Sequence, residues 1–264
     1  MSAARRWAAE LAAWAIPEEI EKAAPEPPWG FPVGLWRDRA AETAADNPSR
    51  RRALEALPEG GAVLDVGTGA GAAAFALVPP AASAVGFDQS PRMLEAFGER
   101  AEDLGVAHTE IQGTWPDGAE QAPEADVVVC HHVFYNAARL EEFARALDGH
   151  ARHRVVVELT AVHPMTAFNQ IWKHLHGLDR PGGPSAVDAL AVLREAGIDA
   201  QMESWLRDPR PIRDRAEFVA FVRRRMCVGA DRDPEIDELL GEERSAGTRE
   251  VATIWWDAGA TRQR

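Results

Sequence analysis

The sequence has very few cysteines and only one tyrosine. Cys130 and Cys227 lie far apart and lack the close Cys or His spacing that binds structural zinc. Two isolated cysteines make no disulfide framework, so a reducing compartment fits, and we expect a cytoplasmic protein. No apolar run approaches the roughly 18 residues that a membrane-spanning helix needs. The basic Arg5 and Arg6 are followed by Glu10 rather than by a continuous apolar segment, which does not fit a signal peptide.

Basic residues are also scarce relative to acidic ones. The chain has 29 Lys and Arg against 42 Asp and Glu, which gives a net charge of −13. Such a charge disfavours general binding to nucleic acid or to an anionic membrane, because both require a positive surface. Residues 205–227 are a local exception, since seven arginines stand there against three acids. We interpret them as a solvated helix face that balances acidic neighbours; an anionic acceptor or an RNA contact is the alternative, although interleaved aromatics are missing.

The apolar fraction of 46% supports a packed globular core. Short apolar runs predict strands at residues 62–66, 84–88, 106–111, 126–131, 154–159, 198–205 and 251–258. Helical patterns fill most gaps, notably at 91–104, at 138–149 and between Ser185 and Gly197. The alternation predicts an α/β fold with a parallel sheet and helices on both faces.

The most informative segment is residues 63–71, with the sequence VLDVGTGAG. It predicts a strand with an acid near its end, a turn with glycines at 67, 69 and 71, and then a helix over 72–78. Glycine permits otherwise strained angles and close approach of a ligand, and the helix start offers free N–H groups. The spacing Gly67-x-Gly69-x-x-Ala72 fits a dinucleotide fingerprint. The spacing Gly67-x-Gly69-x-Gly71 after Asp65 instead resembles the first motif of class I S-adenosylmethionine-dependent methyltransferases.

Two later segments strengthen that resemblance. The second strand ends at Asp88, which is 21 residues after Gly67, and a carboxylate there suits the ribose hydroxyls of either cofactor class. Its continuation, Asp-x-Ser-x-x-Met-Leu, and the fourth-strand sequence ADVVVCHHVF at 125–134 are similar to the methyltransferases. The resemblance covers about residues 60–160. It implies S-adenosyl-L-methionine as cofactor and a Rossmann-like, seven-stranded, mostly parallel sheet whose last strand is inserted antiparallel.

The resemblance also implies site residues. For the cofactor they are Asp65, Gly67, Thr68, Gly69, Gly71, Asp88, Gln89, Thr114, Trp115 and His131. Thr114 and Trp115 stand where the family usually places an acid beside the adenine. Trp115 is predicted either to stack on the adenine or to pack in the core.

Acceptor residues are harder to predict, because methyl transfer mainly requires two positioned reactants and the exclusion of water. We expect His131 or His132 to act as a general base, since an imidazole titrates in the suitable range. Acceptor-binding candidates are Tyr135, Asn136, His163, Trp172 and Arg180. A metal site would have as its ligands Glu158, His163, His174 and His176. Their spacing matches no zinc motif, and we predict no metal.

We expect one domain over residues 1–264, divided into an N-terminal helical arm or lid (1–58), a cofactor-binding core (59–160) and acceptor-side elements (161–264). The arm begins with a helix at about 3–16 whose apolar stripe contains Trp7, Leu11 and Trp14, and which Pro17 ends. Residues 24–36 are rich in proline and aromatics and either pack on the core or cover the site. A short helix is predicted at 47–57, and helical additions are expected before the last strand.

We therefore predict an S-adenosylmethionine-dependent methyltransferase for a small-molecule acceptor. An NAD(P)-dependent oxidoreductase is the first alternative, although Arg139 stands where a Tyr-x-x-x-Lys pair would place lysine. A non-catalytic cofactor-binding protein is the second. An RNA methyltransferase is the third, although Asn136 is followed by Ala137 and not by the Pro-Pro-Tyr of base-flipping enzymes.

Overall fold

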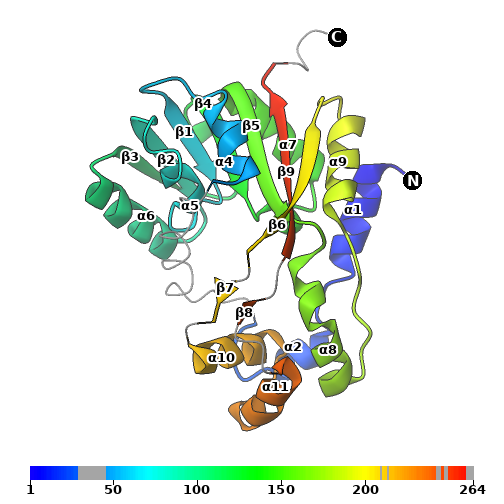
Figure 1. The fold of residues 1–264 in the computed structure, drawn as a ribbon. Coiled ribbons are helices and arrows are strands. Elements are labelled where there is room, and N and C mark those ends of the chain that lie inside the picture. The colour runs from blue at the N-terminus through cyan, green and yellow to red at the C-terminus, as the bar shows by residue number, and fades with distance from the viewer. Residues whose placement is uncertain (29–45, 209, 213, 242–244, 247–248, 260–264) are drawn as a thin grey trace.

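The computed structural model describes residues 1–28, 46–208, 210–212, 214–241, 245–246 and 249–259 (Figure 1). A seven-stranded sheet forms the centre of these residues, in the order β3-β2-β1-β4-β5-β9-β6. The strands are β1 (Ala62–Val66), β2 (Ser83–Asp88), β3 (Ala107–Gln112), β4 (Ala125–His131), β5 (Ala151–Thr160), β6 (Gln201–Arg207) and β9 (Arg249–Asp257). Only β9 runs antiparallel to its neighbours in this sheet, β5 and β6. The predicted fold class and the antiparallel last strand are confirmed.

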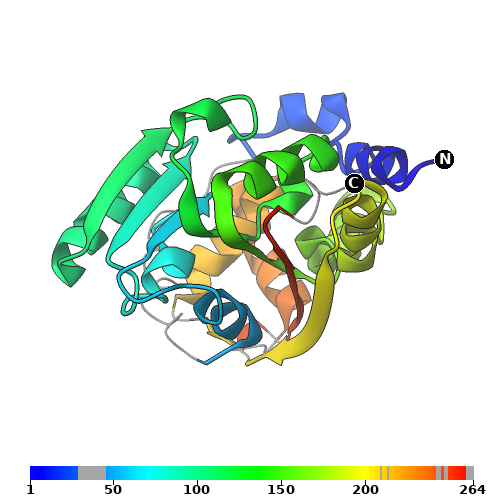
Figure 2. The ribbon, with the colours of Figure 1, turned by 90° about the horizontal axis from the view of Figure 1, so that it is seen from above.

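Helices cover both faces of the sheet (Figure 2). One face carries α1 (Ala3–Ala12), α7 (Leu140–His150) and α9 (Ala186–Glu195); the other carries α4 (Pro48–Leu54), α5 (Ala72–Phe75) and α6 (Pro91–Leu104). The central strands are buried from both sides, which explains their continuous apolar sequences. Helix α9 begins at a capping box, where Ser185 and Asp188 exchange side-chain and backbone hydrogen bonds.

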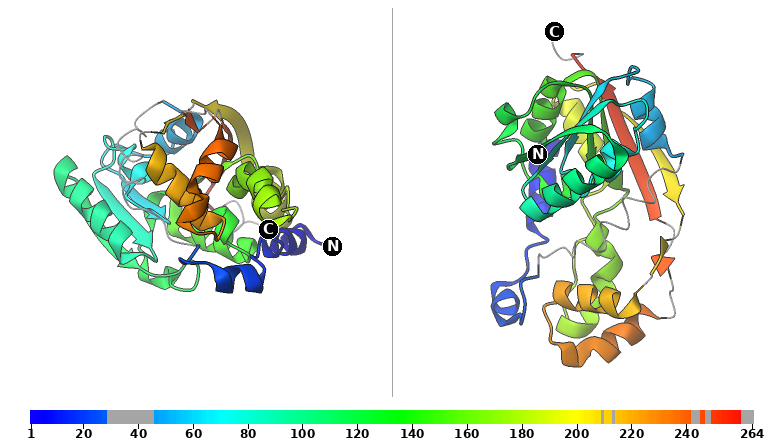
Figure 3. Two further views of the ribbon diagram at one scale, coloured as in Figure 1. Left: turned by 90° about the horizontal axis from the view of Figure 1, so that it is seen from below. Right: turned by 90° about the vertical axis from the view of Figure 1, so that its left-hand side faces the viewer.

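A separate group of helices lies beyond the carboxyl ends of the parallel strands (Figure 3). It contains α2 (Glu18–Ala23), α8 (Asn169–His176), α10 (Arg215–Arg225) and α11 (Asp233–Leu240), with the small strand pair β7 (Arg210–Pro211) and β8 (Ser245–Ala246). These helices share an apolar cluster around Trp172, Val222 and Ile236. The short 3-10 segments are η1 (Ala119–Gln121), η2 (Phe134–Asn136), η3 (Pro164–Phe168) and η4 (Ala230–Arg232).

Several predicted boundaries are wrong. Helix α1 ends at Ala12 rather than near residue 16, because the chain turns there to bury Trp14. Helix α5 ends at Phe75, shortly before Pro79 and Pro80, which donate no backbone hydrogen bond. Strand β6 begins at Gln201, because Ile198 still closes the end of α9 through its N–H to Leu193.

Residues 161–184, for which the sequence pattern predicts neither a strand nor a helix, contain helix α8, which forms because Ile171 and Trp172 bury on one side of it. Most of the proline- and aromatic-rich segment at 24–36 lies outside the described residues, so the proposed lid stays a prediction. None of the helices in the described ranges is long and apolar enough to cross a membrane.

Candidate active site

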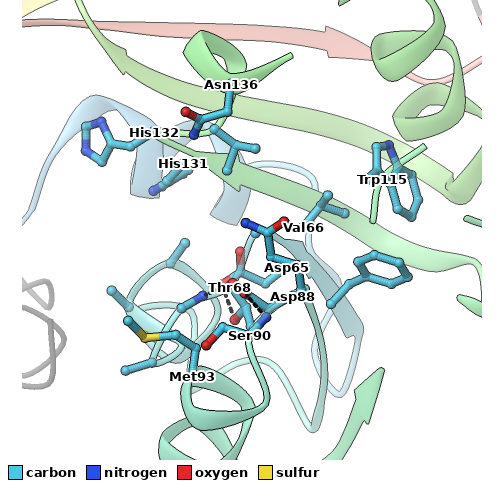
Figure 4. A pocket seen from close by; sticks show the side chains of 18 of the residues that line it. Asp65, Val66, Thr68, Asp88, Ser90, Met93, Trp115, His131, His132 and Asn136 are labelled. Atoms are coloured by element: carbon cyan, nitrogen blue, oxygen red, sulfur yellow. Dashed lines mark hydrogen bonds between the residues drawn. The ribbon is translucent and has the colours of Figure 1, made fainter. Parts of the chain in front are cut away.

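A cavity of about 520 Å³ opens at the carboxyl ends of β1, β2 and β4. This edge of an open parallel sheet is where such folds bind their ligands. Its walls include the glycine loop after β1, the end of β2, the loop after β3 and the end of β4 (Figure 4). A cavity of this size is within the usual range for small-molecule sites.

Asp65, near the end of β1, holds the glycine loop through hydrogen bonds. Its Oδ2 accepts hydrogen bonds from the Thr68 hydroxyl at 3.0 Å and from the Ala74 N–H at 3.1 Å. The carboxyl group is buried, and burial, together with the nearby charge of Asp88, raises its pKa to about 7 despite these two hydrogen bonds. Asp65 therefore acts mainly as an anchor that joins the loop to the first turn of α5.

The loop needs glycine for two different reasons. Gly67, Gly69 and Gly71 have φ angles of 72°, 52° and 77°, all in the left-handed region. At Gly67 a Cβ atom would also lie 2.3 Å from Val133 Cγ2, and at Gly71 it would lie 2.1 Å from the Phe75 ring. Gly69 has open space around it, so there only the backbone angle favours glycine.

Asp88 closes the other side of the loop. Its Oδ2 accepts from the Gly69 N–H and its Oδ1 from the Ser90 N–H, both at 2.9 Å. Each carboxylate oxygen has a second lone pair, so the group can still accept bonds from a ligand. Gln89 is exposed beside it and also lines the cavity.

The loop after β3 forms a third wall, with Thr114 exposed and Trp115 buried. The Trp115 indole donates to the carbonyl of Phe143 at 3.2 Å and packs edge-on against Phe87 and His150. Trp115 is thus a core residue with one face toward the cavity, and its stacking on an adenine stays a prediction.

His131, His132 and Asn136 lie together on the side of the cavity formed by the end of β4 (Figure 4). Burial is the main cause that lowers the pKa of His131 to about 4, so its ring is neutral at pH 7. Its Nε2 is buried and has no hydrogen-bond partner among the described residues. His132 has a φ of 61°, which no other residue of β4 or its exit loop shares, and its N–H donates to the carbonyl of Glu158 at 2.6 Å.

A charged network continues from His132 across the sheet. Glu158 Oε1 lies 3.2 Å from His132 Nε2 and forms an ion pair with Arg207, while Oε2 accepts from the Ser49 hydroxyl at 2.7 Å. Both Arg207 Nη atoms lie 3.3 Å from His132 Nε2. Although burial opposes it, the positive and hydrogen-bonding neighbours of Glu158 hold its pKa well below the usual range, so the carboxylate is ionised.

Four predicted acceptor residues do not line the cavity. Tyr135 points into the core, where its hydroxyl donates to the Thr160 carbonyl at 2.6 Å and its ring stacks on Trp7. His163 stacks on Trp14 at 4.2 Å, and burial lowers its pKa to about 4. Both side chains bury against residues of the N-terminal segment instead of facing the cavity, so a role of Tyr135 and His163 in acceptor binding stays a prediction.

Trp172 and Arg180 are the other two. The Arg180 guanidinium lies 4.8 Å from the Trp172 ring centre and donates to the carbonyl oxygens of Trp14 and Ala15. Both residues therefore join α8 to the chain that follows α1, at a distance from the cavity wall.

The four residues considered as metal ligands are dispersed. His174 pairs with Glu235 at 2.8 Å, and His176 donates to the Met226 carbonyl at 2.7 Å. Within the described ranges no group of three or more His, Cys, Asp or Glu side chains has the arrangement of a metal site.

Glu158 and Arg207 line the cavity, although the sequence pattern does not predict it. The sequence indicates Glu158 only as a candidate metal ligand and Arg207 only as part of an arginine-rich stretch. Their positions near the carboxyl ends of strands are the one feature that could have placed them at the cavity. Other arginines of that stretch pair with acids at the surface: Arg215 with Asp237, and Arg223 with Asp233 and Glu26.

Residues 64–157, which hold the glycine loop, Asp88 and the end of β4, match the family model described as a methyltransferase domain. Residues 64–157 therefore carry a methyltransferase domain. The predicted family and the prediction of a methyltransferase enzyme are confirmed by this match together with the seven-stranded fold.

Relatives agree with the fold. The YcgJ protein of Bacillus subtilis is 20% identical, with a TM-score of 0.53 over 80% of this chain and 97% of that protein. A protein of Bacillus halodurans C-125 is 19% identical, with a TM-score of 0.53 over 82% and 98% of the two chains. A Haemophilus influenzae protein described as uncharacterized is 25% identical over 246 residues, which are 87% of this methyltransferase and 91% of the relative.

Proposed function

We propose that the cavity binds S-adenosyl-L-methionine and that the enzyme transfers its methyl group to a small-molecule acceptor. One observation carries the proposal: a glycine loop and Asp88 form one wall of a single cavity, and the polar end of β4 forms another. The loop can hold the amino-acid part of the cofactor, and Asp88 the ribose. Thr114 and Trp115 flank the space left for the adenine.

Held there by the glycine loop and Asp88, the cofactor would supply an activated methyl group for an in-line displacement from its sulfur. The chain's own residues then orient the acceptor and receive its proton. His132 is the better base of the two histidines, because the buried His131 resists protonation while the Glu158 carboxylate lies beside His132 Nε2. Asn136 is placed to orient the acceptor.

With an acceptor identified, the pH–rate profiles of His132→Ala and His131→Ala test this step. Loss of the acidic limb, on which a general base becomes protonated and inactive, is expected in His132→Ala, with that limb kept in His131→Ala. Two profiles that match the parent enzyme would dismiss the base.

The cofactor is tested by thermal unfolding with S-adenosylhomocysteine, NAD or NADP at equal concentrations. A ligand at about 100 times its dissociation constant stabilises by about 2.7 kcal/mol. In a chain of this size that raises the midpoint by about 5–10 °C. We expect a shift with S-adenosylhomocysteine alone. A shift with a dinucleotide alone would reject the proposal in favour of the oxidoreductase.

Asp88→Ala is the matched site variant. It removes the carboxylate that would accept the ribose hydroxyls, and hydrogen bonds to charged groups contribute about 1.5–3 kcal/mol each. We expect S-adenosylhomocysteine affinity to fall by about 10- to 100-fold in calorimetry. Asp103→Ala removes an exposed acid from α6 and serves as the control. Equal affinity in the two variants would contradict the ribose role.

A further inference from the structure

A second polar region borders the cavity where β5, β9 and β6 end. Strands β5 and β6 run in the same direction, and β9 lies antiparallel between them. The carboxyl ends of β5 and β6 and the amino end of β9 therefore meet at the edge of the sheet that holds the cavity. Glu158, Arg207 and Arg249 all stand at this edge.

Arg207 and Arg249 are direct cross-strand partners. Directly opposed residues of antiparallel strands point to the same face, and like charges in such positions repel each other. Water screens this repulsion only in part, because both arginines are partly buried. Burial first, and then the charge of Arg207, lowers the pKa of Arg249.

Glu158 offsets only part of this positive charge. Its carboxylate forms an ion pair with Arg207, which leaves one formal positive charge among the three residues. The same contact fixes the position of the guanidinium at the cavity wall. An arginine has five N–H donors in a planar fork, so the Arg207 guanidinium keeps donors for a second acidic group beside its contacts with Glu158 and His132.

We propose that the acceptor carries an acidic group, a carboxylate or a phosphate, which binds to Arg207 at this end of the cavity. Arg249 strengthens the binding through its charge, and Glu158 is a positioning residue that orients the Arg207 fork. The planar fork matches both kinds of acid. A bound acidic group would also reduce the repulsion between the charges of Arg207 and Arg249, which the strand register places opposite each other. This inference rests on the proposed function only in identifying the ligand as the methyl acceptor.

The test uses matched small molecules on the full-length protein, with and without S-adenosylhomocysteine. The probes are benzoate, succinate and phenyl phosphate, with benzamide and succinamide as the neutral counterparts of the carboxylates. Ligand-observed NMR measures their binding. We expect the acids to bind in preference to the amides, and the carboxylate and phosphate arms show which acid is favoured. Amides that bind as well as acids, or no acid-selective binding at all, would overturn the proposal.

Three variants then locate the binding. Arg249→Gln leaves the Glu158–Arg207 ion pair intact, and the double variant E158Q/R207Q removes both of its members so that no buried charge is left alone. We expect each to weaken acid binding by about tenfold or more, because charge-assisted hydrogen bonds are the strong ones. Arg5→Gln, an exposed change on α1, is the control for net charge. Acid binding that persists unchanged in all three would overturn the site.

Calorimetry with S-adenosylhomocysteine separates this inference from the proposed function. Retained S-adenosylhomocysteine affinity in the two site variants, together with lost acid selectivity, supports the acidic-acceptor site. Acid selectivity without any S-adenosylhomocysteine binding by the parent protein would keep the anion site and reject the cofactor.

Discussion

Gly67 is constrained twice, by its positive φ angle and by the Val133 side chain that lies against it. Val133 belongs to the exit of β4, so this contact ties the glycine loop to the wall that holds the two histidines. Gly60 has a nearly equal φ of 75° but nothing within 4 Å of a Cβ atom. The two positions separate the effect of the backbone angle from the effect of close packing.

Gly67→Ala should therefore destabilise the fold more than Gly60→Ala. A left-handed alanine costs about 1–2 kcal/mol, and overpacking adds about 1–3 kcal/mol. We expect losses of about 2–4 kcal/mol for Gly67→Ala and about 1 kcal/mol for Gly60→Ala in urea unfolding. Equal losses would mean that Val133 moves aside without cost.

Asp65 makes stability depend on pH with an unusual sign. Its folded-state pKa is about 7, above the ordinary value of 3.8, so the folded protein binds a proton that the unfolded chain has released. This contribution is full at low pH and is lost as pH rises through 7. From pH 5 to pH 8 we expect it to fall by about 2–3 kcal/mol.

Asp65→Asn removes that titration, so the difference between variant and parent isolates it from all other groups. The free energy of unfolding of the variant, relative to the parent, should rise over this pH range when ligand is absent. A difference that stays flat from pH 5 to pH 8 would show that Asp65 titrates normally in the folded protein.

At the scale of elements, the N-terminal helix α1 supports η2, which forms part of the cavity wall. Trp7 of α1 is fully buried, stacks on Tyr135 and donates to the Ala137 carbonyl at 2.8 Å. Both contacts hold η2, whose last residue, Asn136, lines the cavity. Tyr135 thus helps to hold the cavity wall in place, although its own side chain does not line the cavity.

Trp7→Phe should cost about 2–4 kcal/mol of stability, because it leaves a cavity and a buried carbonyl without its donor. Trp14→Phe is the matched control, since it also removes an indole hydrogen bond, to the Gly183 carbonyl, but reaches η2 only through the His163 ring that packs against Tyr135. We expect amide NMR signals of residues 133–136 to shift more in Trp7→Phe than in Trp14→Phe. Equal shifts in both variants would contradict a specific support of η2.

Much of this element structure was predictable because its signals are local. The core strands, the capping box of α9 and the glycine loop follow from neighbouring residues in the chain. Helix α8 was missed because the residues that bury its apolar side come from α10 and α11, far along the sequence. For the same reason the pattern around His163 suggested a pocket, whereas the ring is covered by Trp14 from the other end of the chain.

At the scale of the whole molecule, sheet order decides which residues meet. Asp65 and Asp88 lie close in sequence and on neighbouring strands, so their shared site was predictable from spacing. Glu158 and Arg207 meet because β5 and β6 run in the same direction on either side of β9, and no local pattern indicates that strand order. The side of the cavity formed by the glycine loop and Asp88 could thus be inferred from the chain, while the side formed by Glu158 and Arg207 required the fold.

This arrangement also predicts two kinds of response to the cofactor product. The glycine loop and the end of β2 line the cavity, whereas α10 and α11 belong to the helical group with its own apolar cluster. Contiguous groups of this kind often open independently of the rest of a protein.

We expect S-adenosylhomocysteine at about 100 times its dissociation constant to slow hydrogen exchange at residues 67–71 and 88–90 by up to about 100-fold. Exchange in α10 and α11 should not change, and mass spectrometry of proteolytic fragments measures both regions at once. Equal slowing in both regions would show that the helical group opens only together with the sheet, and no slowing at residues 67–71 would contradict the cofactor site itself.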